Sequence, residues 1–261
     1  MRSRADFLSM DLEAVRAQID AVDREIIQKL NERVRLASEV ARAKHASGAP
    51  IYVPSREEQV FEKLQALNAG PLTEKAVRSI YREIISAMIA LERPLRIAYL
   101  GPEATYTHQA ALKNFGSSLS YEPLATIPDV FAAVEKGEAD YGVIPIENST
   151  GGAVLHSLDM LIDSALKIVA QVYLNIEHCL ISHSPFEEIR EVRSKDQALM
   201  QCRDWLARHL PHAALIDMHS TAQAVQAAGR EKGVAAVASS LASELDRVPV
   251  VARGSQDRAD N

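Results

Sequence analysis

The sequence lacks the features that mark disulfide-stabilised, exported and membrane-spanning proteins. It contains only two cysteines, Cys179 and Cys202, which form neither a disulfide framework nor a metal-binding spacing. No run reaches the roughly 18 apolar residues of a membrane span, and the first residues, MRSRADFLSM, lack the apolar core of a signal peptide. We therefore expect a cytoplasmic protein with two reduced thiols.

The chain also lacks an excess of positive charge. The formal net charge is −6 at pH 7, and it is uneven, because residues 1–93 carry a balance of +1 and residues 94–261 a balance of −7. A nucleic-acid-binding surface needs a basic excess, so we expect no nucleic-acid partner, and likewise no membrane partner. Any site for an anion must be built from a few focused cations.

The first third of the chain has the pattern of one long helix. Residues 11–45 place apolar side chains three or four positions apart, and no Gly or Pro occurs before Gly48. A helix of about 35 residues is roughly 52 Å long, so two short helices of the same chain cannot cover its apolar stripe. We therefore expect a homodimer in which a second copy covers it.

Two shorter helices are expected to follow. Ser55 and Glu58 have the spacing of a capping box that begins the second helix. Thr73 can cap the third helix, which should end near Glu92 because Pro94 follows. The sequence therefore predicts an all-helical domain over residues 1–93.

After Pro94, strand-like and helix-like segments alternate, which predicts an α/β domain with mostly parallel sheets over residues 94–261. Strands are expected at residues 96–101, 141–147, 172–181, 191–194, 213–217 and 233–239. Helices are expected up to residue 115, at 127–136, after Gly152, at 196–209 and at 220–231.

One stretch, GVIPIENSTGG at residues 142–152, places a carboxylate, an amide and two hydroxyls at the end of an expected strand. Ligands of open α/β sheets bind beyond the carboxyl ends of the strands, which makes Glu147, Asn148, Ser149 and Thr150 candidates for a site. The same residue types also form turns and helix N-caps. On the residues alone, both interpretations stay open.

Three cations of the long helix raise a similar question. Arg33 and Lys44 are eleven residues apart, which places them about 20° apart on one helix face. Arg16 lies about 25 Å from Arg33 along the axis, so it can reach the same small ligand only from a second subunit in an antiparallel pair. The alternative is that each is an ordinary solvated surface charge.

The motifs VRAQIDAVD, ERVRLASEVARAK and IYVPSREE, within residues 10–93, resemble the all-helical class of chorismate mutases. The resemblance implies three helices per chain in an intertwined dimer, with Arg16 donated across the dimer to the other subunit's site.

The same resemblance implies roles for further residues. Arg33, Lys44 and Arg56 would clamp the two carboxylates and the ether oxygen of chorismate. Glu57 would accept a hydrogen bond from the substrate hydroxyl. Met88 and Glu92 complete the implied site, in which Lys44 and Glu92 are the catalytic residues.

The rearrangement of chorismate to prephenate is intramolecular and needs no nucleophile, so we expect no cofactor and no metal. The enzyme folds the substrate and stabilises the charge that grows on the ether oxygen. Glu92 falls where many of these mutases have Gln, and it can donate to that oxygen only when protonated. Val53 stands where some relatives have Asp. We expect structural roles for His108, His156 and His178.

The motifs LGPEATYTHQAAL and GVIPIENSTGGAVLHSLD resemble prephenate dehydratases, from about residue 95 to the end of the chain. The resemblance implies two α/β lobes with an active cleft between them, as in two-lobed periplasmic binding proteins. It also implies that Glu147 and Asn148 are catalytic. The other implied cleft residues are Thr105, Ser149, Thr150, Ser194, Gln197 and Thr221.

The order of the two resemblances matches the bifunctional enzyme of bacterial phenylalanine synthesis, with some departures. Ala104 replaces a usual Gly, and Lys195 and Asp196 are atypical. The chain ends at Asn261, before the family's Thr-Arg-Phe motif and its phenylalanine-sensing ACT domain. We expect an incomplete dehydratase domain. For a chain that is complete, we expect mutase activity, little or no dehydratase activity and no phenylalanine inhibition. The alternative is a mutase fused to a catalytically dead two-lobed binding or regulatory module.

Overall fold

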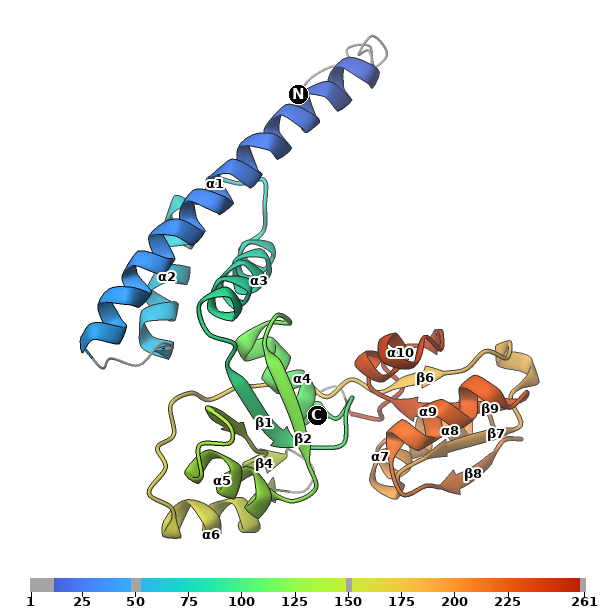
Figure 1. Ribbon diagram of the computed structural model, residues 1–261. Coiled ribbons are helices and arrows are strands. Elements are labelled where there is room, and N and C mark those ends of the chain that lie inside the picture. Colours follow the sequence, from blue (N-terminus) through green and yellow to red (C-terminus); the bar gives the residue numbers. More distant parts are fainter. Residues whose placement is uncertain (1–11, 48–52, 149–151, 259–261) are drawn as a thin grey trace. The chain divides into compact units, whose positions relative to one another are not determined.

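The computed structural model describes residues 12–47, 53–148 and 152–258. The chain divides into two compact units, residues 1–93 and residues 94–261 (Figure 1). The first unit is all helical and the second is α/β, which confirms the predicted fold classes.

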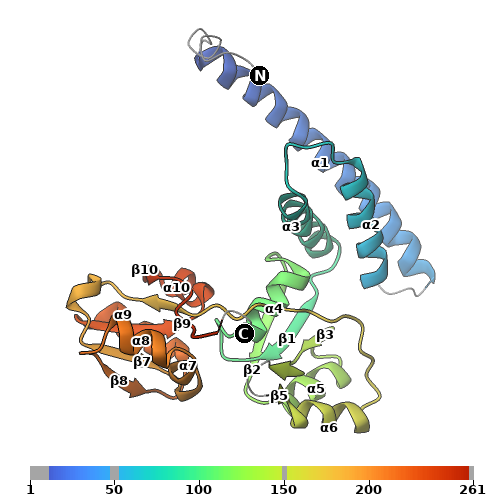
Figure 2. The ribbon, with the colours of Figure 1, turned by 180° about the vertical axis from the view of Figure 1, so that it is seen from behind.

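Three helices form the described part of the first unit. They are α1 (Leu12–Ser47), α2 (Pro54–Leu67) and α3 (Glu74–Glu92). α3 contacts both α1 and α2, as Figures 1 and 2 show. The Thr73 hydroxyl accepts a hydrogen bond from the Ala76 amide at 3.2 Å, which confirms the predicted N-cap of α3.

The start of α2 differs from the expected capping box. Val53 is the N-cap residue, no side chain caps the helix, and Pro54 occupies its first turn. Proline suits this position because its fixed φ is helical and its missing N–H would have had no partner there. Ser55 lies inside the helix, and the prediction of a Ser55–Glu58 capping box is therefore wrong.

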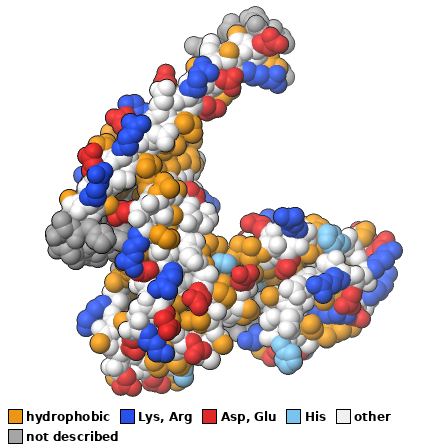
Figure 3. Space-filling model, viewed as in Figure 1, with side chains coloured by type: hydrophobic (Ala, Val, Ile, Leu, Met, Phe, Trp, Pro, Cys, Tyr) orange, Lys and Arg blue, Asp and Glu red, His pale blue; other side chains and the backbone are white. Residues whose placement is uncertain are grey.

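The apolar stripe of α1 is exposed along the helix in the single chain. Ile19 is 54% exposed and Val40 is 57% exposed, although they lie 21 residues apart on the same element. The other exposed large apolar residues of α1 are Leu12, Val22, Ile26, Ile27 and Leu36. Figure 3 shows hydrophobic side chains beside the charged ones on this helix. An apolar surface of this extent marks an interaction site.

The α/β unit contains two lobes. The first lobe, residues 94–163, is built on a parallel sheet with the strand order β2-β1-β3. Its elements are β1 (Arg96–Leu100), α4 (Tyr106–Phe115), β2 (Ser120–Leu124), α5 (Ile127–Glu135), β3 (Tyr141–Val143), β4 (Glu147–Asn148), β5 (Gly152–Ala153) and α6 (Leu155–Asp163). Residues 97–99 of the central strand β1 are fully buried, as expected for a strand covered on both faces.

The second lobe, residues 178–258, contains a five-stranded sheet with the order β10-β6-β9-β7-β8. β7, β8 and β9 are parallel to one another, β6 runs antiparallel to its neighbours β9 and β10, and β10 therefore has the same direction as β9. The elements are β6 (Cys179–Ile181), a 3₁₀ turn (Phe186–Glu188), β7 (Glu191–Ser194), α7 (Asp196–Gln201), α8 (Arg203–His209), β8 (Ala214–Asp217), α9 (Thr221–Arg230), β9 (Val234–Ala238), α10 (Ser240–Asp246) and β10 (Val250–Ala252).

The central strand β9 is buried at every position. Val234, Ala236 and Ala238 pack with residues of α9 and α10, whereas Ala235 and Val237 pack with residues of α7 and α8. Because side chains alternate across a strand, the run VAAVA supplies both layers of the second lobe's core.

The N-terminus of α8 is fixed by a residue near the end of the described chain. The Asp257 carboxylate accepts hydrogen bonds from the backbone amides of Trp205 at 2.7 Å and Asp204 at 3.0 Å. The Trp205 ring stacks on His209 with centroids 4.3 Å apart and meets Phe186 edge-on at 6.4 Å. A negative charge at a helix N-terminus is favourable. The Asp257 contact therefore fixes the end of the described chain to α8 of the second lobe.

Two strand predictions need correction. The strand expected over residues 141–147 is split into β3 and β4, because Pro145 between them cannot donate to a ladder. The strand expected over residues 172–181 pairs only from Cys179 onwards. Residues 172–177 alternate between half-buried and exposed without forming a ladder, so the pattern predicted the face of each side chain and not the pairing.

Two hydrogen bonds, Tyr106–His178 and Ser239–Ala104, connect the two lobes. The Tyr106 hydroxyl of α4 lies 2.9 Å from His178 Nδ1, and His178 Nε2 lies 2.7 Å from Gln201 Oε1. The Ser239 hydroxyl donates to the Ala104 carbonyl at 2.9 Å. Ala104, whose φ is 64°, packs into the core of the second lobe. The loop that begins α4 is thus held by both lobes.

Burial of His178 predicts that the α/β unit loses stability in acid. Desolvation lowers the pKa of His178 in the folded chain, whereas in the unfolded chain it titrates near about 6.5. Below about pH 6.5 the unfolded state therefore binds more protons than the folded state. As the pH falls, the free energy of unfolding decreases by up to about 1.4 kcal/mol per pH unit.

We expect the calorimetric melting temperature of the α/β unit to fall between about pH 7.5 and about pH 5.5. His178→Gln should reduce this slope, and buried His108, whose pKa is also lowered by desolvation, accounts for a remainder. His183→Gln, at an exposed position, is the matched control and should leave the slope unchanged. An unaltered slope in the His178 variant would contradict the prediction.

Candidate active sites

The candidate mutase residues of the described structure fall on all three helices of the first unit. Arg33 of α1 is half-buried and donates a hydrogen bond to the sulfur of buried Met88 on α3. Glu57 of α2 is buried and forms an ion pair with Arg82 of α3. Met88 and Arg82 are six residues apart, about 9 Å along the helix axis. α3 therefore contacts one predicted site residue from each neighbouring helix, Arg33 of α1 and Glu57 of α2.

Other predicted mutase residues are not brought to these contacts within one chain. Arg16 is exposed near the start of α1, and Glu92 is exposed at the end of α3. Arg56 is exposed and donates to Gln59 Oε1 at 3.0 Å along its own helix. Lys44 belongs to α1, but its side chain lies outside the described residues. Val53, which replaces the Asp of some mutases, is half-buried at the N-cap of α2.

Sequence reasoning missed the arginine that pairs with Glu57. Arg82 and Arg78 both lie over the Phe61 ring, with guanidinium carbons 4.9 Å and 4.4 Å from its centroid. Arg78 also pairs with Glu58, so the adjacent glutamates of α2 face arginines one turn apart on α3. The spacing of the two arginines, four residues, was the available signal.

The first lobe places its candidate dehydratase residues after the ends of neighbouring strands. Thr105 follows β1 and caps α4, accepting from the His108 amide at 3.3 Å and donating to the Leu100 carbonyl at 3.2 Å. Glu147 is exposed and Asn148 is half-buried on β4, which pairs with β5. Ser149 and Thr150 lie outside the described residues.

The alternative interpretation, a turn with a helix N-cap, can be followed only at Glu147 and Asn148, and neither of them caps α6. The next helix, α6, begins at Leu155, and its N-cap is Val154, which makes no side-chain cap. Glu147 and Asn148 form β4, in which Glu147 pairs with Ala153 and Asn148 pairs with Gly152 of β5. The carboxylate of Glu147 and the amide of Asn148 therefore lie at the edge of the first lobe and do not cap α6.

The second lobe gathers its candidates at one edge of its sheet. β7, β8 and β9 are parallel, so their carboxyl ends lie together, and α7, α9 and α10 begin there. Ser194 ends β7, Gln197 is exposed in α7, and Thr221 is the first residue of α9. The Asp196 amide donates to Asp217 Oδ1 at 2.8 Å, which joins two of these strand ends.

Ser194 is not open to solvent in this arrangement. Its side chain is fully buried and its hydroxyl donates to the Val237 carbonyl. The Ser239–Ala104 hydrogen bond joins the strand-end edge of the second lobe to the loop that follows β1. The loop that carries Thr105 therefore meets the strand-end edge of the second lobe, and ligands of α/β sheets bind at such edges.

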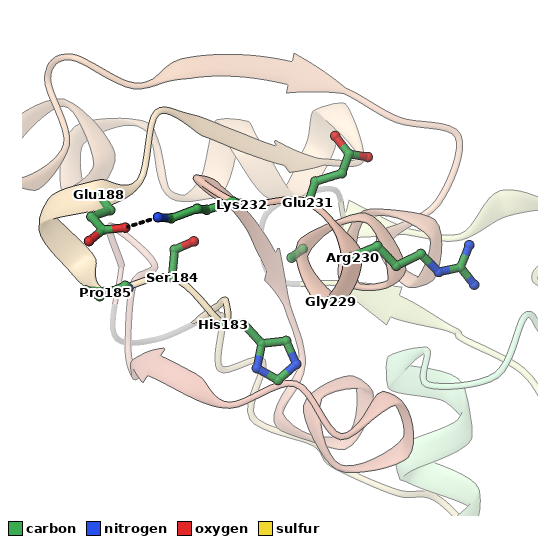
Figure 4. A pocket seen from close by; sticks show the side chains of 9 residues that line it. His183, Ser184, Pro185, Glu188, Gly229, Arg230, Glu231 and Lys232 are labelled. Atoms are coloured by element: carbon green, nitrogen blue, oxygen red, sulfur yellow. Dashed lines mark ion pairs between the residues drawn. The ribbon is translucent and has the colours of Figure 1, made fainter.

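A separate hollow of about 310 Å³ lies at the opposite edge of the second lobe. Figure 4 shows Ser184 beside the ion pair of Glu188 and Lys232, which are 3.6 Å apart, while Arg230 extends away from them. The hollow adjoins the C-terminal end of α9, where unpaired carbonyls disfavour an anion. None of the predicted site residues lines it.

The two cysteines are unsuited to nucleophilic roles. Both are free and buried. Burial raises the pKa of Cys179 and raises the pKa of Cys202 to about 12, so little thiolate is present at neutral pH. The chemistry of both candidate sites therefore depends on carboxylates, amides, hydroxyls and cations.

None of the described helices combines the length and the apolar character needed to cross a lipid bilayer.

Comparison with known proteins identifies both halves of the chain. The family model described as chorismate mutase type II matches residues 15–93, and the one described as prephenate dehydratase matches residues 97–261. The bifunctional chorismate mutase/prephenate dehydratase of Aquifex aeolicus is 43% identical over 256 residues, which cover 96% of this chain and 71% of that protein. The Stutzerimonas stutzeri protein of the same name is 40% identical, with coverages of 96% and 70%.

A solved structure matches the α/β unit. Prephenate dehydratase from Arthrobacter aurescens, in complex with L-Phe, superposes with a TM-score of 0.58 at 26% identity, covering 64% of this chain and 57% of that one. The matched families follow one another in the order that the motifs predict. The chain belongs to the family of bifunctional chorismate mutase/prephenate dehydratases.

Proposed function

We propose that residues 1–93 rearrange chorismate to prephenate and that residues 94–261 dehydrate and decarboxylate prephenate to phenylpyruvate. The helical half of this proposal rests chiefly on one observation. The long helix α1 exposes its apolar stripe while it carries cations that one chain cannot gather around a single ligand.

In the proposed mutase, positive side chains and hydrogen-bond donors enclose a substrate that carries two carboxylates. Arg33, Lys44 and Arg56 bind the carboxylates and the ether oxygen, because guanidinium groups bond carboxylates in a bidentate way. Glu57 accepts the substrate hydroxyl, and Glu92 donates to the ether oxygen. These contacts hold the reactive conformer and stabilise the developing charge.

We propose a homodimer in which the stripes of two α1 helices cover each other and Arg16 enters the partner's site. Support comes from the exposed apolar residues of α1, since a surface of this kind is rarely left uncovered. Arg16 lies about 25 Å from Arg33 along the helix axis, so a second subunit is the available source of the missing cation.

In the proposed dehydratase, Glu147 and Asn148 act on the leaving hydroxyl. Prephenate loses CO₂, its ring becomes aromatic, and the expelled hydroxide takes up one proton to leave as water. Glu147 is exposed at the strand end and can supply that proton. Hydrogen bonds from Ser149, Thr150, Gln197 and Thr221 orient the substrate carboxylates. Ser194 and Thr105, whose hydroxyls donate to the Val237 and Leu100 carbonyls, hold the backbone beside the substrate.

We propose that the enzyme works in the cytoplasm. Free, buried Cys179 and Cys202 suit a compartment in which thiols stay reduced.

The two activities should be separable by mutation. Arg33→Ala should lower chorismate turnover by at least about 100-fold, since a charge-paired substrate contact is lost, and leave phenylpyruvate formation from added prephenate unchanged. Glu147→Gln should do the reverse. Both reactions are assayed on one preparation of each variant. If the unaltered protein produces no phenylpyruvate from prephenate, the alternative of a catalytically dead binding module is favoured.

Sharing of the mutase site across the dimer can be tested by mixing inactive variants. Arg16→Ala and Arg33→Ala should each be inactive, but heterodimers formed by co-refolding them contain one intact site. Random pairing should restore about a quarter of the wild-type mutase activity. Arg33→Ala mixed with Arg56→Ala is the matched control, because both residues serve the same chain's site, and it should restore nothing. A lack of recovery in the first mixture would refute the shared site.

Glu92 should make the mutase dependent on pH. A carboxyl group can donate to the ether oxygen only in its protonated form, so turnover should rise as the pH falls. Glu92→Gln, whose amide donates at every pH, should flatten the profile. The measurement is kcat/KM for chorismate across the pH range, and an unchanged profile in the variant would remove Glu92 from the site.

A further inference from the structure

The ion pair between Glu57 and Arg82 lies beneath the surface of the helical unit. The exposed fractions of the two side chains are 7% for Glu57 and 14% for Arg82. One carboxylate oxygen, Oε1, accepts from Arg82. The other, Oε2, is buried and has no hydrogen-bond partner among the described residues.

This half-satisfied carboxylate is costly in the single chain. A buried carboxylate is tolerated when it is paired and its remaining oxygen is hydrogen-bonded. Arg82 supplies the pairing, and its guanidinium is itself held over the Phe61 ring, a favourable position for a cation. Oε2 can therefore still accept a hydrogen bond from one donor.

We propose that Arg82 is a positioning residue of the mutase, which anchors Oε1 of Glu57 so that Oε2 accepts the hydroxyl of chorismate. This inference rests on the proposed role of Glu57 as the hydroxyl acceptor. Arg82 acts through Glu57 and does not touch the substrate, because its guanidinium is engaged by Glu57 and by the Phe61 ring.

Arg78 offers a matched control within the same helix. It lies one turn before Arg82, over the same Phe61 ring, and donates to Glu58 at 2.9 Å and 2.6 Å. Its pair is about half exposed, with side-chain exposures of 49% and 53%. Arg78→Gln therefore removes a similar contact between α2 and α3 without altering the buried carboxylate.

The test compares kcat/KM for chorismate and for an analogue that lacks the hydroxyl. Arg82→Gln should lower the value for chorismate by at least about tenfold and leave the value for the analogue near that of the wild type. Arg82→Lys, which restores a cation beside Glu57, should recover part of the loss. Arg78→Gln should stay within about twofold of the wild type for both substrates, as expected for an exposed pair.

The double variant Glu57→Gln/Arg82→Gln carries the test even if Arg82→Gln alone does not fold, since it removes both charges together. It should be no slower than Glu57→Gln alone, because Arg82 has no partner left to position. A multiplied loss would overturn the inference by placing Arg82 on the substrate itself. A folded Arg82→Gln with the wild-type rate would also overturn it while leaving the proposed function intact. Wild-type turnover by Glu57→Gln would instead refute the proposed role of Glu57 and the inference with it.

Discussion

The helical unit depends on a mismatch of lengths. α1 has 36 residues, whereas α2 has 14 and α3 has 19, so the long helix extends well beyond what its own chain can cover. Its uncovered part carries a stripe of exposed apolar side chains beside charged ones, and burial of apolar surface is the dominant favourable term in association. A helix of this length also separates Arg16 from Arg33 further than a small dianion can bridge. The same constraint therefore explains the exposed stripe and, for the mutase site proposed above, why Arg16 would come from a second subunit.

In the α/β unit, the candidate site residues lie at the strand ends of two small sheets. Each sheet ends its parallel strands at an edge where loops and helix starts carry hydroxyls, amides and carboxylates. The loop between β1 and α4 is fixed by Ser239 through Ala104 and by His178 through Tyr106. Thr105 lies between these two contacts and keeps its place as the cap of α4. Contacts between lobes are thus concentrated around a residue of the candidate site.

The sequence predicted the elements whose pattern is local and strong. The period of three to four residues in α1 and the Thr73 cap of α3 follow from near neighbours in the chain and were confirmed. β2, in which Ser120, Glu122 and Pro123 are exposed, shows no clear alternation and was missed. Pairing was predicted less well than burial, because residues 172–177 alternate correctly and yet form no ladder. A ladder requires a partner strand, which a local pattern does not specify.

Site residues divide along the same line. Cations on one helix face could be grouped from spacing alone, and the family motifs supplied the carboxylates and hydroxyls. Arg82 could not be found this way, because its importance comes from a contact with Glu57 across 25 positions of sequence. The buried, unsatisfied oxygen of Glu57 is likewise a property of packing. Long-range contacts of this kind become visible only when the helices are placed side by side.

Trp205 gives the molecule a built-in optical reporter. It is the only tryptophan of the chain, and it is held in the second lobe by Asp257 and Phe186. Its stacking on His209 places a group that quenches indole emission when protonated directly against the ring. Tryptophan fluorescence of this chain therefore reports on the second lobe, because the helical unit and the first lobe contain no tryptophan.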